Sequence, residues 1–150
     1  MRRSSGVLFV LLAMFGLARG VEGQQDPAKA CGRDASEFFL GQNYPNPFAA
    51  GTATRIPFTL CDALFAEGRA VVVSVRVVNV IQQFVAAPAA RNHPAGQGVP
   101  ATQLEYLQPG SYLTEWDGRD QNGAPVASGI YWVQLTVNGA STTRRLFVAR

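Results

Sequence analysis

Histidine and cysteine are scarce in this sequence: its 150 residues include one histidine, His93, and two cysteines. These residues do not have the spacing of a zinc site. The chain also lacks the nucleophilic serine turn of hydrolases and the glycine-rich loop that binds phosphates. Glu105 and Glu115 fall on different expected segments, so we do not expect them to form a catalytic pair. The sequence therefore predicts no catalytic residue, no bound metal and no cofactor, and indicates a protein that is not an enzyme.

A long apolar run is also missing. The apolar residues near the N-terminus extend from Val7 to Leu17, about half of the roughly 20 residues that a membrane-spanning helix needs. Arg2 and Arg3 precede this run and small residues follow it, which is the pattern of a signal peptide cleaved before Gln24. We expect residues 1–23 to be a signal peptide, with no integral membrane segment after its removal. The expected location is the periplasm, the outer-membrane surface or the extracellular space.

Charged residues make up only 15% of the chain, and the net charge is +3. The expected signal peptide holds three arginines and one glutamate, so its removal leaves a net charge of +1. A nearly neutral domain lacks the basic surface that nucleic-acid binding needs. We therefore expect no nucleic-acid partner.

Both cysteines, Cys31 and Cys61, follow the expected cleavage site. An even number of cysteines in an exported protein favours a disulfide, with free or intermolecular thiols as the alternative. Lys29 and the distance from the apolar run argue against lipid attachment at Cys31. Residues 24–37 are small and polar, and we expect them to be a linker that Cys31 ties to the domain.

Hydrophobic residues make up 47% of the chain, enough to form a core, and they alternate with polar residues over several short segments. The residues expected to face inward are Ile56, Phe58 and Leu60; Val71, Val73, Val75 and Val77; and Tyr131, Val133, Leu135 and Val137. Asn138-Gly139 is a typical two-residue hairpin turn, and it leads into a final strand at 141–149. We expect an all-β fold over residues 38–150, an antiparallel sandwich of about seven strands that is immunoglobulin-like or fibronectin-like.

Prolines limit where two segments can lie. Residues 44–48, Tyr-Pro-Asn-Pro-Phe, are expected to run extended along an edge or end of the sandwich, with Tyr44 and Phe48 as anchors. Pro57 removes a backbone donor from the strand at 55–60, so that strand is expected at a sheet edge or beside a bulge.

Two further segments are expected to be loops. Residues 86–100 contain three prolines and two glycines, which predicts a long surface loop with His93 in solvent. Asp117, Asp120 and Asn122 could be compared with a calcium loop, but no terminal glutamate follows them. A turn in which these side chains bond to their own backbone is the favoured interpretation.

Residues 116–131, Trp-Asp-Gly-Arg-Asp-Gln-Asn-Gly-Ala-Pro-Val-Ala-Ser-Gly-Ile-Tyr, closely resemble the C-terminal (type A) sorting domain of type IX secretion cargo. They equally resemble the immunoglobulin-like domain of the flagellar hook-cap protein. Leu-Gly-Gln-Asn-Tyr-Pro-Asn-Pro-Phe at 40–48 and Thr-Arg-Arg-Leu-Phe-Val at 143–148 resemble the sorting family specifically. That family usually has aspartate, glycine and arginine where this chain has Asn79, Gln82 and Gln83.

The resemblance implies what the domain does. A sorting domain is recognised by an outer-membrane export apparatus and delivered to the cell surface, whereas a hook-cap domain supports assembly of a surface appendage. The candidate contacts for such a protein partner are Trp132, Arg144, Arg145 and Arg150. Trp132 would also support a carbohydrate-binding accessory domain. Ordinary cross-strand packing of arginine stems on the indole, or arginines that keep a strand edge soluble, are the structural alternatives.

Overall fold

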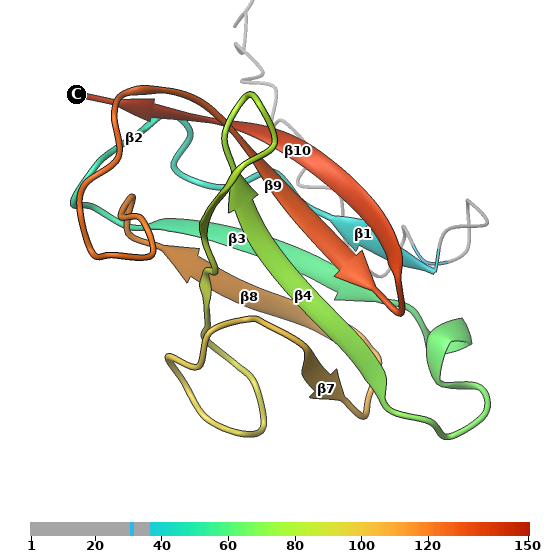
Figure 1. Ribbon diagram of the computed structural model, residues 1–150. Helices are drawn as coiled ribbons and strands as arrows, with labels where there is room; N and C mark the ends of the chain where they lie inside the picture. Colours follow the sequence, from blue (N-terminus) through green and yellow to red (C-terminus); the bar gives the residue numbers. More distant parts are fainter. Residues whose placement is uncertain (1–30, 32–36) are drawn as a thin grey trace, which may run out of the picture.

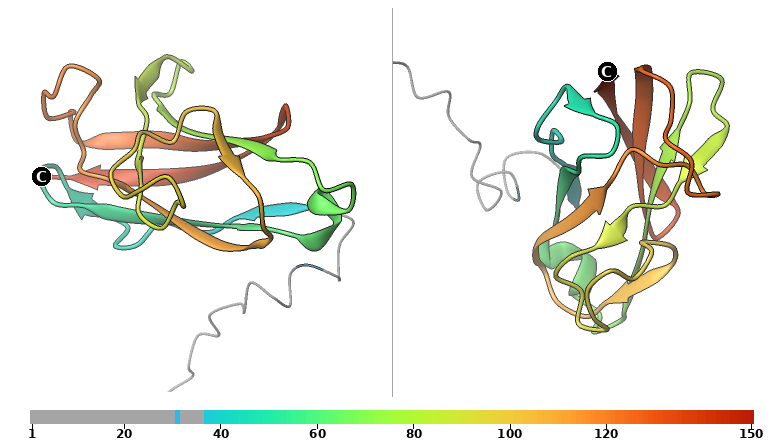
Figure 2. Two further views of the ribbon diagram at one scale, coloured as in Figure 1. Left: turned by 90° about the horizontal axis from the view of Figure 1, so that it is seen from below. Right: turned by 90° about the vertical axis from the view of Figure 1, so that its left-hand side faces the viewer.

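The computed structural model describes Cys31 and residues 37–150, which form a two-layered β-sandwich (Figure 1). The expected signal peptide, residues 1–23, and most of the expected linker, residues 24–37, lie outside the described residues. Figure 2 shows the two layers one above the other, with β9 and β10 in one and β3 in the other. The predicted all-β sandwich is confirmed.

The first sheet has the strand order β1-β3-β8-β6, and the second has the order β2-β10-β9-β4-β5, with β7 beside β4. The strands are β1 Phe38–Leu40, β2 Phe48–Ala49, β3 Thr54–Leu60, β4 Val71–Val78, β5 Phe84–Ala86, β6 Ala89–Ala90, β7 Leu104–Tyr106, β8 Gly110–Trp116, β9 Gly129–Val137 and β10 Ala140–Ala149, and a single 3-10 turn covers Asp62–Phe65. Neighbouring strands are antiparallel except β2 and β10. More strands form than the seven expected because several have only two or three residues.

The core forms between the sheets from the side chains that the alternation predicted. Ile56, Phe58 and Leu60 are at most 1% exposed, and so are the four inward valines of β4. Each such burial stabilises the fold by about 1.5–3 kcal/mol relative to an exposed side chain. Tyr131 differs from this expectation, since it is only half-buried. The inward pattern of the sequence is therefore the main determinant of the sandwich.

The strand that contains Pro57, β3, was expected at a sheet edge or beside a bulge, but it is not an edge strand. β3 lies between β1 and β8, but β1 ends at Leu40, which pairs with Phe58. The amide of Gly41 donates to the carbonyl of Pro57 over 2.8 Å, so the missing proline donor removes only one bond at the end of that ladder. A Cβ at Gly41 would lie 2.7 Å from Pro57 Cγ, which explains the glycine opposite the proline.

The proline-containing segment at 44–48 is anchored differently from the expectation. Phe48 is 3% exposed and its ring centroid lies 5.5 Å from that of Trp116, as an anchor should. Tyr44, however, is 49% exposed. The second anchor is Asn43, a buried amide that donates to the hydroxyl of Thr54 over 2.9 Å. A hydrogen bond inside the fold, which alternation cannot reveal, thus holds this segment.

The turn after β8 uses its acidic side chains internally. The carboxylate of Asp120 accepts from the amides of Asn122 and Ala124 at 2.9 and 3.0 Å. The indole of Trp116, which is 3% exposed, donates to the carbonyl of Arg119 over 2.8 Å. These bonds fit the turn interpretation. Within residues 37–150 and Cys31, no cluster of three or more histidine, cysteine, aspartate or glutamate side chains could hold a metal ion.

Residues 86–100 are more ordered than the predicted surface loop. Ala86 ends β5 in the second sheet, and β6 then pairs with β8 in the first sheet, where Ala90 is fully buried. His93 is half-buried: its Nδ1 accepts from the amide of Ala95 over 3.0 Å, and its Nε2 lies 2.9 Å from the carbonyl of Glu105. A carbonyl can only accept, so Nε2 donates to Glu105 in this contact. The prolines led to the prediction of a loop, whereas the chain passes here from β5 in the second sheet to β6 in the first.

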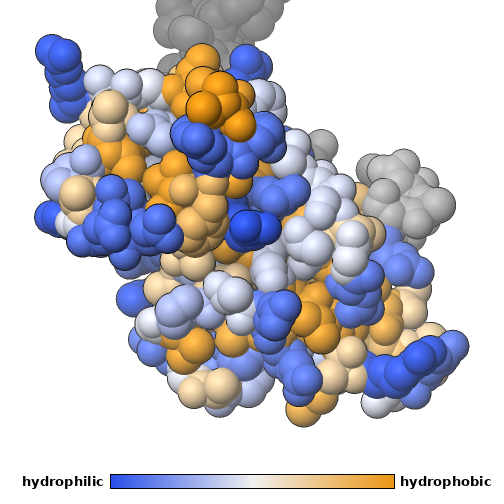
Figure 3. All heavy atoms as spheres, viewed as in Figure 1, coloured by the Kyte–Doolittle hydropathy of each residue, from blue (hydrophilic) through white to orange (hydrophobic). Residues whose placement is uncertain are grey.

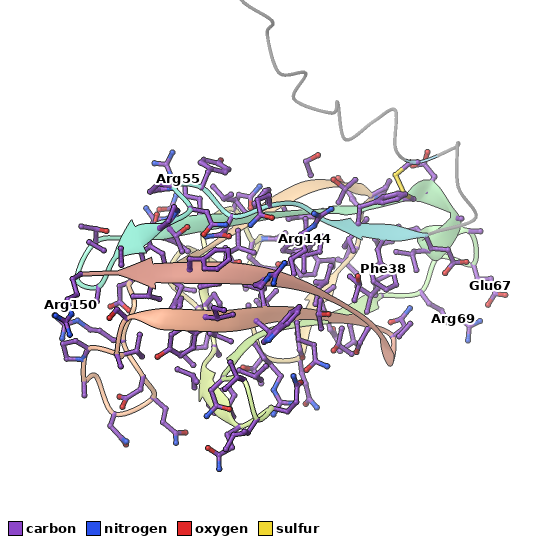
Figure 4. All side chains as sticks on the ribbon, turned by 90° about the horizontal axis from the view of Figure 1, so that it is seen from above. Phe38, Arg55, Glu67, Arg69, Arg144 and Arg150 are labelled. Carbon is purple, nitrogen blue, oxygen red and sulfur yellow. A yellow bond between two sulfur atoms is a disulfide. The ribbon has the colours of Figure 1, made fainter. Side chains whose placement is uncertain are left out.

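Cys31 and Cys61 form the predicted disulfide, with Cα atoms 5.5 Å apart. Figure 4 shows this bond at the end of the molecule where β1 begins. The bond ties the segment before β1 to the end of β3. Over the part of the chain that is described, no helix has the length and hydrophobicity to cross a membrane.

Candidate functional site

The β9–β10 hairpin carries three of the four candidate contact residues, Trp132, Arg144 and Arg145, and its turn determines which way each one points. Asn138 and Gly139 have φ angles of 47° and 89°, which is the geometry of the favoured two-residue hairpin turn. The side-chain oxygen of Asn138 accepts from the amide of Val72 over 2.9 Å and fixes the turn against β4. The register runs without a shift from Ala140 opposite Val137 to Val148 opposite Gly129.

Four side chains gather on the outer face of this hairpin, away from the core. Arg145 lies opposite Trp132, and Phe147 lies opposite Ile130. We call Ile130, Trp132, Arg145 and Phe147 the outer-face cluster. Counting from the turn, both pairs are non-hydrogen-bonded pairs, in which opposing side chains come closest. The arginine guanidinium lies 5.9 Å from the Trp132 ring centroid and 5.8 Å from that of Phe147.

The outer-face cluster is partly exposed to solvent although it is mostly apolar. Ile130 is 41% exposed and Phe147 is 38% exposed. Trp132, expected to be exposed, is half-buried with the Arg145 guanidinium above it. Further along the same sheet, the guanidinium of Arg76 lies 5.4 Å from the ring centroid of Phe84. Aromatic rings combined with arginine thus recur across this face.

Figure 3 shows this side of the molecule in the orientation of Figure 1. Hydrophobic atoms gather at the top, over the hairpin that joins β4 and β5. Val80 and Ile81 form that tip and are 64% and 68% exposed. The outer surface of the second sheet therefore carries more than one apolar area.

Arg144 and Arg150 do not join the outer-face cluster. Arg144 points to the opposite side of β10, where its Nε donates to the carbonyl of Leu40 in β1. Arg150 lies beyond the end of β10, far from Arg144 (Figure 4). The structure brings together Trp132 and Arg145 and separates them from the other two arginines.

Beside Arg144 the outer edges of the two sheets enclose a hollow of about 540 Å³. One wall is formed by Glu37 and β1, and the other by residues 141–144 of β10. Arg144 spans the hollow through its bond to Leu40. This is the open side of the sandwich, where the edge strand of each sheet lies next to that of the other.

Ile130 and Phe147 were not among the candidate residues derived from the sequence. The alternation that placed Trp132 on the outer face also places Ile130 there, two residues earlier in the same strand. Phe147 follows from the hairpin register, because the turn pairs it with Ile130. Both residues could therefore have been predicted from the sequence, but they were not considered because outward-facing positions were assumed to be polar.

Burial raises the pKa of three tyrosines of the sandwich. Loss of solvent, with a further contribution from the nearby Tyr112, raises the pKa of Tyr106 to about 12. Burial also raises the pKa of Tyr112 and that of Tyr131. All three phenols are therefore neutral at physiological pH, and the hydroxyls of Tyr112 and Tyr131 donate to the carbonyls of Gln108 and Ala127.

No model of a known protein family and no curated protein matches the chain. Among solved structures, it is similar to PorZ, an essential bacterial surface component of the type IX secretion system of Porphyromonas gingivalis, at 21% identity and a TM-score of 0.41. It is also similar to dimeric latent PorU of the same organism and to the alkylpurine DNA glycosylase AlkC of Pseudomonas fluorescens, each at 15% identity and a TM-score of 0.46.

These matches cover 79%, 76% and 77% of this chain, and 13% of PorZ, 10% of PorU and 31% of AlkC. The chain thus corresponds to less than a third of each of these proteins. At such identities and TM-scores the likeness carries no argument about function. The fold class follows from the two sheets described above, and a function has to be argued from the surface.

Proposed function

We propose that this domain is exported, has no catalytic activity, and is bound by a protein of an export or surface-assembly apparatus, as a C-terminal sorting or cell-surface attachment domain is. The observation that carries the proposal is the outer-face cluster. It places an isoleucine and two aromatic rings around one guanidinium, on a sheet face where Ile130 and Phe147 remain 41% and 38% exposed.

Such a composition is typical of the centre of a protein–protein interface. Tryptophan, tyrosine and arginine dominate the residues that contribute most to binding, and aromatic residues are enriched in interface cores. Burying the exposed parts of Ile130 and Phe147 against a partner would be favourable at roughly 25 cal/mol per Å². The disulfide between Cys31 and Cys61 supports the exported location, because such bonds persist in oxidising compartments.

The contacts of Trp132 favour a protein over a carbohydrate as the partner. A sugar ring stacks on an open aromatic face, whereas the Arg145 guanidinium lies above the Trp132 ring. Charge on the cluster comes from this arginine, which suits a partner surface that offers carboxylates or carbonyl oxygens next to apolar groups. Carbohydrate binding would first require the arginine to move away.

The test is a reporter fused ahead of residues 24–150 behind an export signal, in a bacterium with a type IX system. We expect the reporter at the cell surface, measured by its accessibility to added protease in intact cells. The double variant Trp132→Ala, Phe147→Ser should lower surface delivery severalfold. Val72→Ser is the matched control, because Val72 is 38% exposed on the same sheet outside the cluster.

Circular dichroism melts of the purified variants confirm that each one is folded. Retention of the intact fusion in the periplasm would contradict the sorting function and leave assembly of a surface structure, the hook-cap alternative, as the better hypothesis. Equal delivery of the double variant and the control would show that the cluster is not the recognised surface.

A further inference from the structure

β10 has two halves that differ in what covers their outer edge. Beyond Arg145 the edge is occupied: Val148 and Ala149 pair with β2, and the amide of Phe147 donates to the side chain of Asn46 over 2.9 Å. The backbone carbonyl of Arg145 accepts from the side-chain amide nitrogen (Nε2) of Gln42 over 3.2 Å. These bonds show that the backbone groups of odd-numbered residues in β10 point away from β9.

The same alternation applies between the turn and Arg145. Because the pair that flanks a two-residue hairpin turn is hydrogen-bonded, Ala140, Thr142 and Arg144 direct their backbone groups to β9. Ser141 and Thr143 then direct theirs outward, as does the amide of Arg145. No other described residue bonds to these five outward groups. This segment, residues 141–145, is called the open edge below.

The open edge lacks two of the features that protect a strand from pairing, since it contains no proline and its register with β9 has no bulge. Its charged residues, Arg144 and Arg145, are a third such feature, which a partner of opposite charge would neutralise. The open edge also borders the hollow of about 540 Å³ between β10 and β1, so space exists for side chains of an added strand. A backbone template and room beside it are the two requirements of strand addition.

A second copy of this chain would meet residues 46–48 if two β10 strands paired about Thr143. Antiparallel pairing of two β10 strands centred on Thr143 would place the Gly139 of one copy opposite the Phe147 of the other, and Asn138 opposite Val148. Asn46 and Phe48 already occupy that position. A short extended segment of about five residues that ends before β2 avoids this overlap, and it is the occupant argued for below.

The charges around the open edge indicate the side chains of that segment. Arg144 faces the hollow and Arg145 faces outward, while Glu37 is the one acidic side chain among the described residues that line the hollow. Successive residues of an added strand face opposite sides, so two adjacent acidic residues would reach both arginines. Opposite charges placed across neighbouring strands favour pairing.

We propose that the open edge binds an extended acidic segment of another protein, which adds as a strand beside β10 and places one carboxylate near Arg144 and one near Arg145. This inference rests on the proposed function in that the segment belongs to the protein partner. It goes further by assigning the mode of recognition, which is backbone pairing rather than contact between side chains alone.

Nuclear magnetic resonance of the oxidised chain, residues 24–150, tests the inference with two probe peptides, Ac-Thr-Val-Glu-Glu-Val-Thr-amide and its counterpart with two lysines. The acidic peptide should shift the amide signals of residues 141–145 and 37–40, and should slow hydrogen exchange at Thr143 and Arg145. The lysine peptide should bind about tenfold more weakly. Equal binding of the two peptides, or no shift at these residues, would overturn the inference.

Thr143→Pro removes an outward donor and fills the edge but leaves the bonds to β9 in place, so it should abolish the shifts. Thr143→Val keeps the donor and should bind normally. An acidic peptide that is N-methylated along one side of its backbone tests the same point on the unmodified protein, should the proline variant not fold. Amides at 143 and 145 that are already protected without peptide, even at high dilution, would show that this chain covers its own edge and would contradict the inference.

The reporter fusion separates this inference from the proposed function. If the fusion reaches the surface and Thr143→Pro does so equally, strand addition is wrong and the sorting function stands. If the acidic peptide binds while the intact fusion remains in the periplasm, the edge binds a partner other than an export component, and the sorting function is wrong.

Discussion

The inner and outer faces of the β9–β10 hairpin both carry large apolar side chains, yet only the inner face is buried. Leu135 and Leu146 are fully buried against the first sheet, whereas Ile130 and Phe147, on the same two strands, are about 40% exposed. Alternation normally puts apolar residues on one face only. The exposed apolar residues of this outer face are the basis of the binding surface proposed above.

The outer face is not apolar along its whole length. Near the turn it is polar: the hydroxyls of Thr136 and Ser141 lie 2.8 Å apart, and Gln134 pairs with Thr143. Near the other end it holds the outer-face cluster. The change from polar to apolar within one hairpin shows that the exposed apolar residues are localised rather than a general property of the sheet.

The largest expected difference between buried and exposed positions is that between the two tryptophans. Trp116→Ala should lower the free energy of unfolding by about 3–5 kcal/mol, because the ring packs on Phe48 and Tyr131 and its indole donates to Arg119. Trp132→Ala should cost about 1–2 kcal/mol, since that ring is half-buried. Urea melts of both variants measure the difference, and equal losses would contradict it.

Two neighbouring residues of β10 sharpen the comparison within one strand. Leu146→Ala should lower the free energy of unfolding by about 2–4 kcal/mol because it leaves a cavity in the core. Phe147→Ala should cost about 1 kcal/mol or less and should instead weaken partner binding. Chemical denaturation is the measurement. A larger loss at Phe147 than at Leu146 would show that the face assignment of the strand is wrong.

High pH should lower the free energy of unfolding because of the buried phenol of Tyr106. The pKa of this phenol is raised from 10.0 to about 12 in the folded state, so the unfolded chain loses the proton first as the pH rises. The stabilisation is therefore present below pH 10 and is lost between about pH 10 and pH 12, by roughly 2–3 kcal/mol. Melts of the wild type and of Tyr106→Phe across this range test it. An equally steep loss in the phenylalanine variant would assign the effect to other groups.

The smallest expected effect is that of Arg145→Gln on the outer face. Its guanidinium lies over the rings of Trp132 and Phe147, so its removal should cost about 0.5–1 kcal/mol. Arg144→Gln is the matched variant on the other side of the strand, where the bond to Leu40 is lost. Fluorescence of Trp132 should change in the first variant only. A change of equal size in both would contradict the separation of the two arginines.

The sequence alone determined the class of the fold and most of its core. Alternation is a local property, so the inward residues of β3, β4 and β9 could be predicted from their own strands. The turn at Asn138-Gly139 fixed the final hairpin for the same reason. The disulfide between Cys31 and Cys61 was predicted from the expected export of the chain, and it is present in the structure.

Only the tertiary structure decided which strands lie at edges and what covers them. Pro57 suggested an edge strand, but β3 lies inside the sheet and tolerates the proline because β1 ends one residue before reaching it. Tyr44 was expected to be an anchor, but the buried Asn43 has that role. The division of β10 into a covered half and the open edge depends on where β2 returns, about a hundred residues away in sequence. Periodicity within a strand specifies which face is buried, but pairing between distant strands depends on how the whole chain packs. That is why the sequence could not show which half of the final strand has an uncovered edge.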